Sequence, residues 1–272
     1  MPDLKRTVEL GSFGRVALLG GLYSNYLALS EALKLARQRG ADTLVALGDF
    51  GAFGPHPDRT VDILRDAGVA AIQGNYEESL STGAEDCHCG YTDPRDNHYA
   101  QISYDYTRRN TSAEHKAWMG TLPGHIRLSI GSRRALLCHG SPRKINEFLW
   151  ASTTPAPFIR KLLRDHDADV VVCTHTGLHW SRFIERGRGV VNAGALGRPA
   201  NDGRTHVWFA VLEADNGDLR VEFVPVPYDH ERLAREMEDE GLPAEFIETV
   251  RTGYWTTCLE VLPARERAQG RH

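Results

Sequence analysis

Four residues with metal-binding side chains each come directly after a short apolar segment. They are Asp49 in Gly48-Asp49, Asn75 in Gly74-Asn75, His139 in Cys138-His139-Gly140 and His175 in Thr174-His175-Thr176. A carboxylate, an amide and two imidazoles are ligands typical of a Mn²⁺, Fe²⁺ or Zn²⁺ site, whereas a structural zinc site is usually built from thiolates. Each residue alone is typical of an ordinary turn or a core histidine, so the prediction of a metal site depends on all four together.

The apolar segments before Asp49 and Asn75 are predicted strands of an α/β fold. Short apolar runs at residues 15–19, 43–47 and 69–72 alternate with segments of helical period. Strands and helices that alternate at this spacing predict parallel βαβ units. Ligands of such sheets gather at the carboxyl ends of the strands, which is where Asp49 and Asn75 lie.

The remainder of the chain shows a less regular pattern. Residues 83–98 are predicted to be a long loop, and Thr111-Ser112-Ala113-Glu114 is a capping box that should begin a helix running through Trp118. We also expect a hairpin that leads into His139, a helix at 157–163, strands at 170–173, 190–192, 207–212 and 219–224, two helices over 229–252 and a frayed tail from Ala264. No composition break marks a boundary, so we expect one domain over residues 1–272 with a helical extension from about residue 229.

Composition limits the classes of function. A net charge of -4 argues against a general electrostatic attraction to nucleic acid. No apolar run approaches the ~20 residues that span a bilayer. Five cysteines without framework spacing fit a reducing compartment, so we expect a cytoplasmic protein.

The segments around the four residues carry a resemblance to a known family. In order and spacing they resemble the second to fifth motifs of the calcineurin-like metallophosphoesterases, closest to the small bacterial phosphodiesterase branch. The matching stretches are Gly48-Asp49-Phe50-Gly51-Ala52-Phe53-Gly54-Pro55, Gly74-Asn75-Tyr76-Glu77, His139-Gly140-Ser141-Pro142 and Thr174-His175-Thr176. The segment Asn192-Ala193-Gly194-Ala195-Leu196-Gly197-Arg198-Pro199 resembles the turn that follows the last metal motif in that family. The resemblance runs from about Val16 to Tyr228. It implies an α/β fold of four layers, an α/β/β/α sandwich with metals at the sheet edge.

The resemblance also implies roles for these residues and shows where the chain departs from the family. Asp49 would bridge two metals, and Asn75, His139 and His175 would complete the second one. The first metal needs an Asp-x-His motif and a further histidine, but this chain has Gly21, Tyr23 and Gly177 at those positions. All three departures fall on one metal site. We therefore expect one firmly bound divalent transition metal (Mn, Fe or Zn) per chain.

Three features could refill the first site. Tyr23 either fills the space left by the metal or ligates an ion as phenolate. His179 could fold back, because His175, Gly177 and His179 would alternate on one side of an extended segment. The Cys87-His88-Cys89 string lies on a loop long enough to reach the site, or it is only a surface loop.

Further residues are candidates for proton transfer and substrate binding. Tyr76 stands where many family members have a histidine that protonates the leaving group, so Tyr76, Tyr23 and His179 are candidate proton donors. Arg143 or Lys144, in the loop after His139, could hold a phosphate oxygen or form a solvated charge pair.

The expectation is a metal-dependent phosphoesterase, most consistent with a phosphodiesterase, that acts through metal-bound water on a small-molecule phosphoester or related metabolite. Two alternatives stay open: a metalloenzyme of the same fold with a lyase or rearrangement reaction, and a non-catalytic binding module. The sequence predicts no particular oligomeric state.

Overall fold

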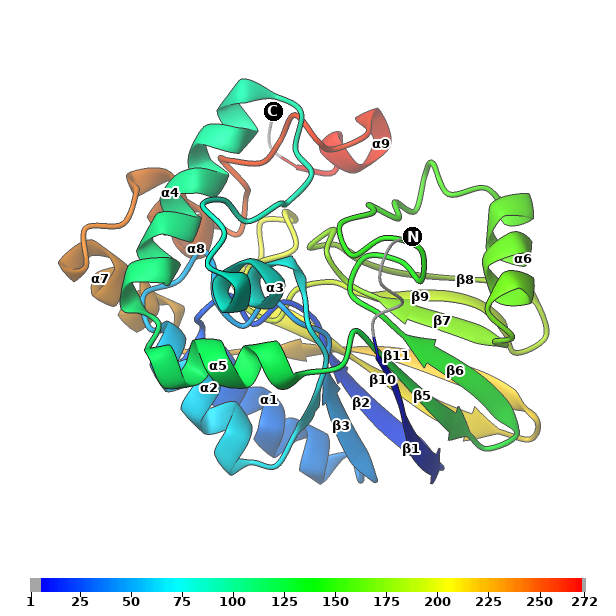
Figure 1. Ribbon diagram of the computed structural model, residues 1–272. Coiled ribbons are helices and arrows are strands. Elements are labelled where there is room, and N and C mark those ends of the chain that lie inside the picture. Colours follow the sequence, from blue (N-terminus) through cyan, green and yellow to red (C-terminus); the bar gives the residue numbers. More distant parts are fainter. Residues whose placement is uncertain (1–5, 271–272) are drawn as a thin grey trace.

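The computed structural model describes residues 6–270, which form two β-sheets with helices on both outer faces (Figure 1). One sheet has six strands in the order β1 (Thr7–Phe13), β5 (His125–Ile130), β6 (Arg133–Leu137), β7 (Val170–Cys173), β9 (Arg188–Ala193) and β8 (His179–Glu185). The other has five strands in the order β11 (Asp218–Val226), β10 (Val207–Asp215), β2 (Arg15–Leu19), β3 (Thr43–Ala46) and β4 (Ala70–Ala71).

The helices follow the strands along the chain. They are α1 (Tyr26–Gln38), α2 (Pro57–Asp66), α3 (Asn75–Thr82), α4 (Pro94–Asn110), α5 (Ala113–Thr121), α6 (Ala156–Asp165), α7 (His230–Asp239), α8 (Ala244–Thr252) and α9 (Ala264–Arg267). Figure 1 shows α1 and α2 beside the five-stranded sheet and α6 beside the six-stranded one. Within residues 6–270, no helix is long and apolar enough to cross a membrane.

Alternation along the strands divides the core into layers. On β2, Val16 and Leu18 belong to the cluster between the sheets, whereas Ala17 and Leu19 pack toward the helices on the outer face. The central strand β7 is buried on both faces, because Val170 and Val172 face the other sheet and Val171 and Cys173 pack against the α6 side. This pattern confirms the predicted four-layer α/β/β/α sandwich.

Parallel pairing brings several strand ends to one region. β2 pairs in parallel with β3 and β3 with β4, while in the other sheet β6 pairs in parallel with β7. The four predicted metal ligands follow β3, β4, β6 and β7. Their common location is therefore a consequence of strand direction.

Most predicted elements are confirmed, and two expectations were wrong. The helix α5 begins after the N-cap Ser112, and α7 and α8 flank the expected break. The segment expected as a loop to residue 98 ends earlier, because Asp93 caps α4 and Pro94 supplies its first residue. The tail from Ala264 begins with the short helix α9, fixed by the buried Glu266, which accepts a hydrogen bond from the backbone N–H of Ser152 at 2.8 Å; residues 271–272 of the predicted tail lie outside the described residues.

Candidate metal centre

Asp49 is held in a left-handed backbone conformation just after β3. Its φ is +57°, and that of the preceding Gly48 is +91°. A Cβ on Gly48 would lie 2.3 Å from the backbone nitrogen of Gly74, so glycine is what allows the loops after β3 and β4 to approach. Asp49 is 4% exposed, and its Oδ2 lies 3.3 Å from Nε2 of His139.

The fully buried carboxylate of Glu77 fixes the Asp49 loop. Its oxygens accept hydrogen bonds from the backbone N–H groups of Asp49 (2.7 Å), Phe50 (2.8 Å) and Gly74 (2.8 Å). Burial and the charge of Asp49 raise the pKa of Glu77 to about 7, although these three bonds favour the ionised form. We assigned no role to Glu77 from the sequence. The available signal was a glutamate in the first turn of a helix, where it can reach back to preceding backbone N–H groups.

Nε2 of His139 lies at the centre of the cluster. The other ring nitrogen, Nδ1, is 2.7 Å from the carbonyl oxygen of Leu47, so Nδ1 donates its proton there and Nε2 faces the site. Asn75 Oδ1 lies 3.0 Å from this Nε2, His175 Nδ1 lies 3.1 Å away, and Asp49 Oδ2 lies 3.3 Å away. Acceptor atoms therefore surround Nε2, and this arrangement requires a proton or a metal ion among them.

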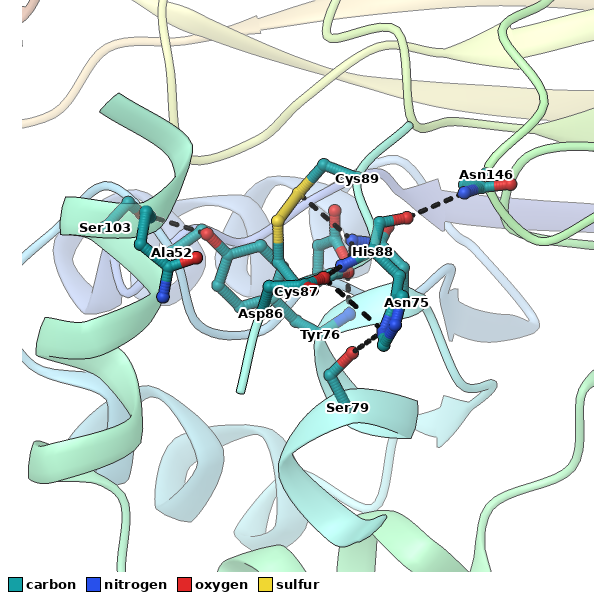
Figure 2. The surroundings of a disulfide bond; sticks show 12 residues. Ala52, Asn75, Tyr76, Ser79, Asp86, Cys87, His88, Cys89, Ser103 and Asn146 are labelled. Carbon is teal, nitrogen blue, oxygen red and sulfur yellow. Dashed lines mark hydrogen bonds and ion pairs between the residues drawn. A yellow bond between two sulfur atoms is a disulfide. The ribbon is translucent and has the colours of Figure 1, made fainter. Parts of the chain in front are cut away.

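A disulfide loop orients the Asn75 side chain. Its Nδ2 donates to the carbonyl oxygen of Cys87 at 2.8 Å and contacts Sγ of Cys89 at 3.3 Å (Figure 2). This leaves Oδ1 facing His139. Cys87 and Cys89 are joined in a disulfide, which we did not expect from the sequence. Neither sulfur is a thiolate in this state, so the alternative that the Cys87-His88-Cys89 string ligates a metal has no support here.

His175 completes the cluster. Its φ is +69°, and its ring stacks on Phe148 at a centroid distance of 4.4 Å. Burial, with the nearby His139, lowers the pKa of His175 to about 3, so the imidazole is neutral, as metal binding requires. Its Nε2 is buried without a hydrogen-bond partner among residues 6–270.

The donor set fits a divalent transition ion. One ligand atom each from Asp49, His139 and His175 lies within 4.8 Å of the others, and all three residues are buried. Burial alone would lower the pKa of His139, but Asp49 raises it overall, and the charge of His139 lowers the pKa of Asp49 against the effect of its burial. The N–H of His139 that bonds the Leu47 carbonyl is the contact usual for metal-ligating histidines.

Tyr23 fills part of the space that a first-site ligand would need. A Cβ on Gly21 would lie 2.5 Å from Cε1 of the Tyr23 ring, so the ring covers Gly21. Burial, followed by the charge of Asp49, raises the pKa of Tyr23 far above its usual value. The hydroxyl therefore remains a phenol at neutral pH, which favours the space-filling role over ligation as phenolate.

A small cavity of about 60 Å³ lies beside the cluster. It is lined by Asp49 and His175 together with Tyr23, Tyr76 and Arg198. The hydroxyl of Tyr76 contacts Oγ of Ser103 at 3.0 Å. The structure thus brings two of the three predicted proton donors, Tyr23 and Tyr76, to this cavity.

His179 is not brought to the cluster. Its ring packs against Trp208 and Phe223, each at a centroid distance of 4.6 Å. We expected an extended segment from residue 175 to 179, but His175 and Gly177 have φ values of +69° and +76°. These left-handed residues turn the chain, so the alternation on which the prediction depended does not apply.

Arg143 and Lys144 line a different cavity. It has a volume of about 740 Å³ and touches the cluster only at His139. The guanidinium of Arg143 forms an ion pair with Glu147 and lies over the ring of Phe158. This favours the charge-pair interpretation for Arg143, while Lys144 remains a predicted phosphate ligand.

Comparisons with known proteins agree with the fold. Residues 15–217 match the calcineurin-like phosphoesterase superfamily domain. An uncharacterized protein of Methanocaldococcus jannaschii is 24% identical over 237 residues, which cover 84% of this chain and 93% of that protein.

Two solved structures show the same fold. A hypothetical protein from Pyrococcus horikoshii aligns with a TM-score of 0.74 and 20% identity, over 89% of this chain and 99% of that one. A metallophosphoesterase from Sphaerobacter thermophilus aligns with a TM-score of 0.67 and 23% identity, over 88% and 98%.

Proposed function

This chain belongs to the calcineurin-like phosphoesterase superfamily, a family of metal-dependent hydrolases, and on that premise we propose that it is a phosphodiesterase for a small molecule. In this proposal Asp49, Asn75, His139 and His175 hold one divalent transition ion. The three positions at which the family carries the ligands of a further ion are occupied here by Gly21, Tyr23 and Gly177.

The arrangement around Nε2 of His139 is the observation that carries the proposal. Oxygen and nitrogen acceptors from Asn75, Asp49 and His175 lie 3.0 to 3.3 Å from this atom. A set of acceptors buried this closely is unfavourable unless a cation lies among them. A divalent ion satisfies all four ligands at once, whereas a proton can join only two of the atoms.

The chain's own residues supply the remaining functions. When bound, a divalent ion acts as a Lewis acid and lowers the pKa of water in the site. Glu77 fixes the backbone that aims Asp49 at the ion, and the loop of Cys87 and Cys89 aims Asn75. The phenols of Tyr76 and Tyr23 line the cavity and are candidates to give a proton to the leaving oxygen.

The proposal is tested with protein saturated with Mn²⁺ and two chromogenic substrates, bis(4-nitrophenyl) phosphate and 4-nitrophenyl phosphate. We expect metal-dependent turnover that is faster on the diester than on the monoester. The rate should be ~10²–10³ below that of two-metal relatives, because the second metal ion, which acts there as a Lewis acid on a reacting oxygen, is missing. Asp49→Asn should abolish turnover, while Asp66→Asn, an exposed change at the end of α2, should not. Metal-saturated protein that hydrolyses neither substrate would point instead to a non-hydrolytic reaction.

A further inference from the structure

Arg198 places a guanidinium in the cavity that Tyr23 lines, and Tyr23 occupies one of the family's ligand positions for a first metal. The turn before Arg198 packs against the segment of Gly21 and Tyr23, since the N–H groups of Leu196 and Gly197 both donate to the carbonyl oxygen of Gly21 at 2.9 Å. A Cβ on Gly197 would lie 2.1 Å from the carbonyl oxygen of Leu22, so this approach depends on glycine. Arg198 therefore enters the same cavity as Asp49 and His175.

Aromatic contacts and one anchored nitrogen fix the orientation of the guanidinium. Its Cζ lies 3.9 Å from the ring centroid of Trp255 and 5.1 Å from that of Phe53. Nη2 donates to the carbonyl oxygen of Thr257 at 2.8 Å, with the hydroxyl of the same residue at 3.4 Å. A side chain held in this way loses little further entropy when it binds a ligand.

The charge of Arg198 is not balanced within the described chain. The residue is 6% exposed, and its Nε is buried without a hydrogen-bond partner. No carboxylate of residues 6–270 forms an ion pair with it, although most other arginines form such pairs on the surface. A buried cation with an unused N–H is costly unless an anion completes it.

We propose that Arg198 binds an oxygen of the substrate's phosphoryl group and so supplies the positive charge that a second metal ion supplies in two-metal phosphoesterases. This inference rests on the proposed function. A planar guanidinium with a free N–H matches a phosphoryl oxyanion in charge and in geometry. The cavity of about 60 Å³ has room for a phosphoryl group in place of a few waters, each of which needs roughly 10–15 Å³.

The first test measures the affinity of Mn²⁺-saturated protein for inorganic phosphate by calorimetry. Arg198→Gln should bind phosphate about ten- to a hundredfold more weakly than the unaltered protein, because a charged hydrogen bond is lost. The phosphate affinity of Arg198→Lys should lie between those of the unaltered protein and Arg198→Gln, since lysine keeps the positive charge but lacks the paired N–H donors of the guanidinium. Arg204→Gln is the matched control, because Arg204 is exposed six residues further on and should leave the affinity unchanged. The same phosphate affinity for Arg198→Gln and the unaltered protein, at equal metal content, would overturn the inference.

The second test uses the unaltered protein, because Arg198 also anchors Thr257 and its replacement could disturb the fold. Crystals soaked with tungstate, a heavy analogue of phosphate, should show an anion oxygen at roughly 2.7–3.2 Å from a nitrogen of the Arg198 guanidinium. An anion that is bound at the cluster but out of contact with Arg198 would overturn the inference.

The turnover assay separates the two proposals. If the unaltered protein hydrolyses bis(4-nitrophenyl) phosphate and Arg198→Gln binds phosphate with unaltered affinity, the role of Arg198 is contradicted and the proposed function stands. Phosphate binding through Arg198 in a protein that hydrolyses no phosphoester would support this inference and contradict the proposed function.

Discussion

The indole of Trp255 lies against the α-carbon of Gly177, so closely that a Cβ there would be 2.9 Å from its Cη2. Two hydrogen bonds, one from the ring and one from the backbone of Trp255, fix the position of the indole. Its Nε1 donates to the carbonyl oxygen of Pro199 at 2.6 Å, and its backbone N–H donates to Asn201 at 2.8 Å. The segment after α8 thus occupies the space in which a side chain at position 177 would lie.

This contact predicts that restoring the family's first-site ligands will not restore a second ion. The variant Gly21→Asp, Tyr23→His, Gly177→His should still bind about one ion per chain and should unfold at a lower temperature. The added histidine would meet Trp255, and its backbone would keep a φ of +76°, which costs an L residue ~1–2 kcal/mol. Elemental analysis and a thermal melt measure both effects.

The double variant Gly21→Asp, Tyr23→His is the matched control for that experiment. The close contact at Gly21 is with the Tyr23 ring itself, which this variant removes. We therefore expect its melting temperature to stay closer to that of the unaltered protein. A triple variant that held two ions at full stability would show that Trp255 does not close the site.

Replacing Glu77 should weaken both the fold and the metal site. The glutamine of Glu77→Gln has one acceptor oxygen, whereas the carboxylate accepts three backbone hydrogen bonds with two oxygens. We expect the free energy of unfolding to fall by ~1–3 kcal/mol in urea titrations and the affinity for Mn²⁺ to fall with it. Glu85→Gln, at an exposed position, is the control. Equal stability and equal metal affinity would mean that Glu77 does not position Asp49.

The parts of the site that were predicted from the sequence depend on local patterns. Asp49, Asn75, His139 and His175 each follow an apolar run, and parallel strands bring such ends together without further information. Gly21, Tyr23 and Gly177 were also recognised from the sequence as departures from the family pattern, because they lie within segments that resemble its motifs.

The residues that we missed reach the site through tertiary packing. Trp255 and Thr257 arrive from a segment that follows two helices and carries no periodic signal, and Arg198 gains its meaning only from its contacts with them. His179 was misplaced for a related reason: a left-handed turn at His175 and Gly177 cannot be seen in side-chain alternation. The orientation of Asn75 by a disulfide loop likewise depends on the folded arrangement.

Reduction of the disulfide should lower metal affinity. The loop of Cys87 and Cys89 holds the amide of Asn75, and outer contacts of this kind are worth about tenfold or more in metal binding. We expect the dissociation constant for Mn²⁺ to rise about tenfold in Cys87→Ser, Cys89→Ser relative to the unaltered oxidised protein. Equal constants would show that the backbone carbonyl of Cys87 alone orients Asn75.

His179 should make the protein sensitive to acid. Burial lowers its pKa to about 4, so the folded state keeps it neutral while the unfolded chain takes up a proton from about pH 6.5. The free energy of unfolding should therefore fall as the pH drops from ~6.5 to ~4, by up to ~3 kcal/mol from this residue. His179→Phe should lose that part of the pH dependence in urea titrations, while His98→Gln, an exposed change on α4, should keep it. An identical pH profile for His179→Phe would contradict the burial argument.

The number of ions bound per chain is measured on purified, Mn²⁺-loaded protein after extensive dialysis. We predict about one tightly held ion per chain, and a large loss of that ion in His139→Ala, since Nε2 of His139 is central to the ligand set. Two tightly held ions per chain in the unaltered protein, or full retention of the ion by His139→Ala, would contradict the account.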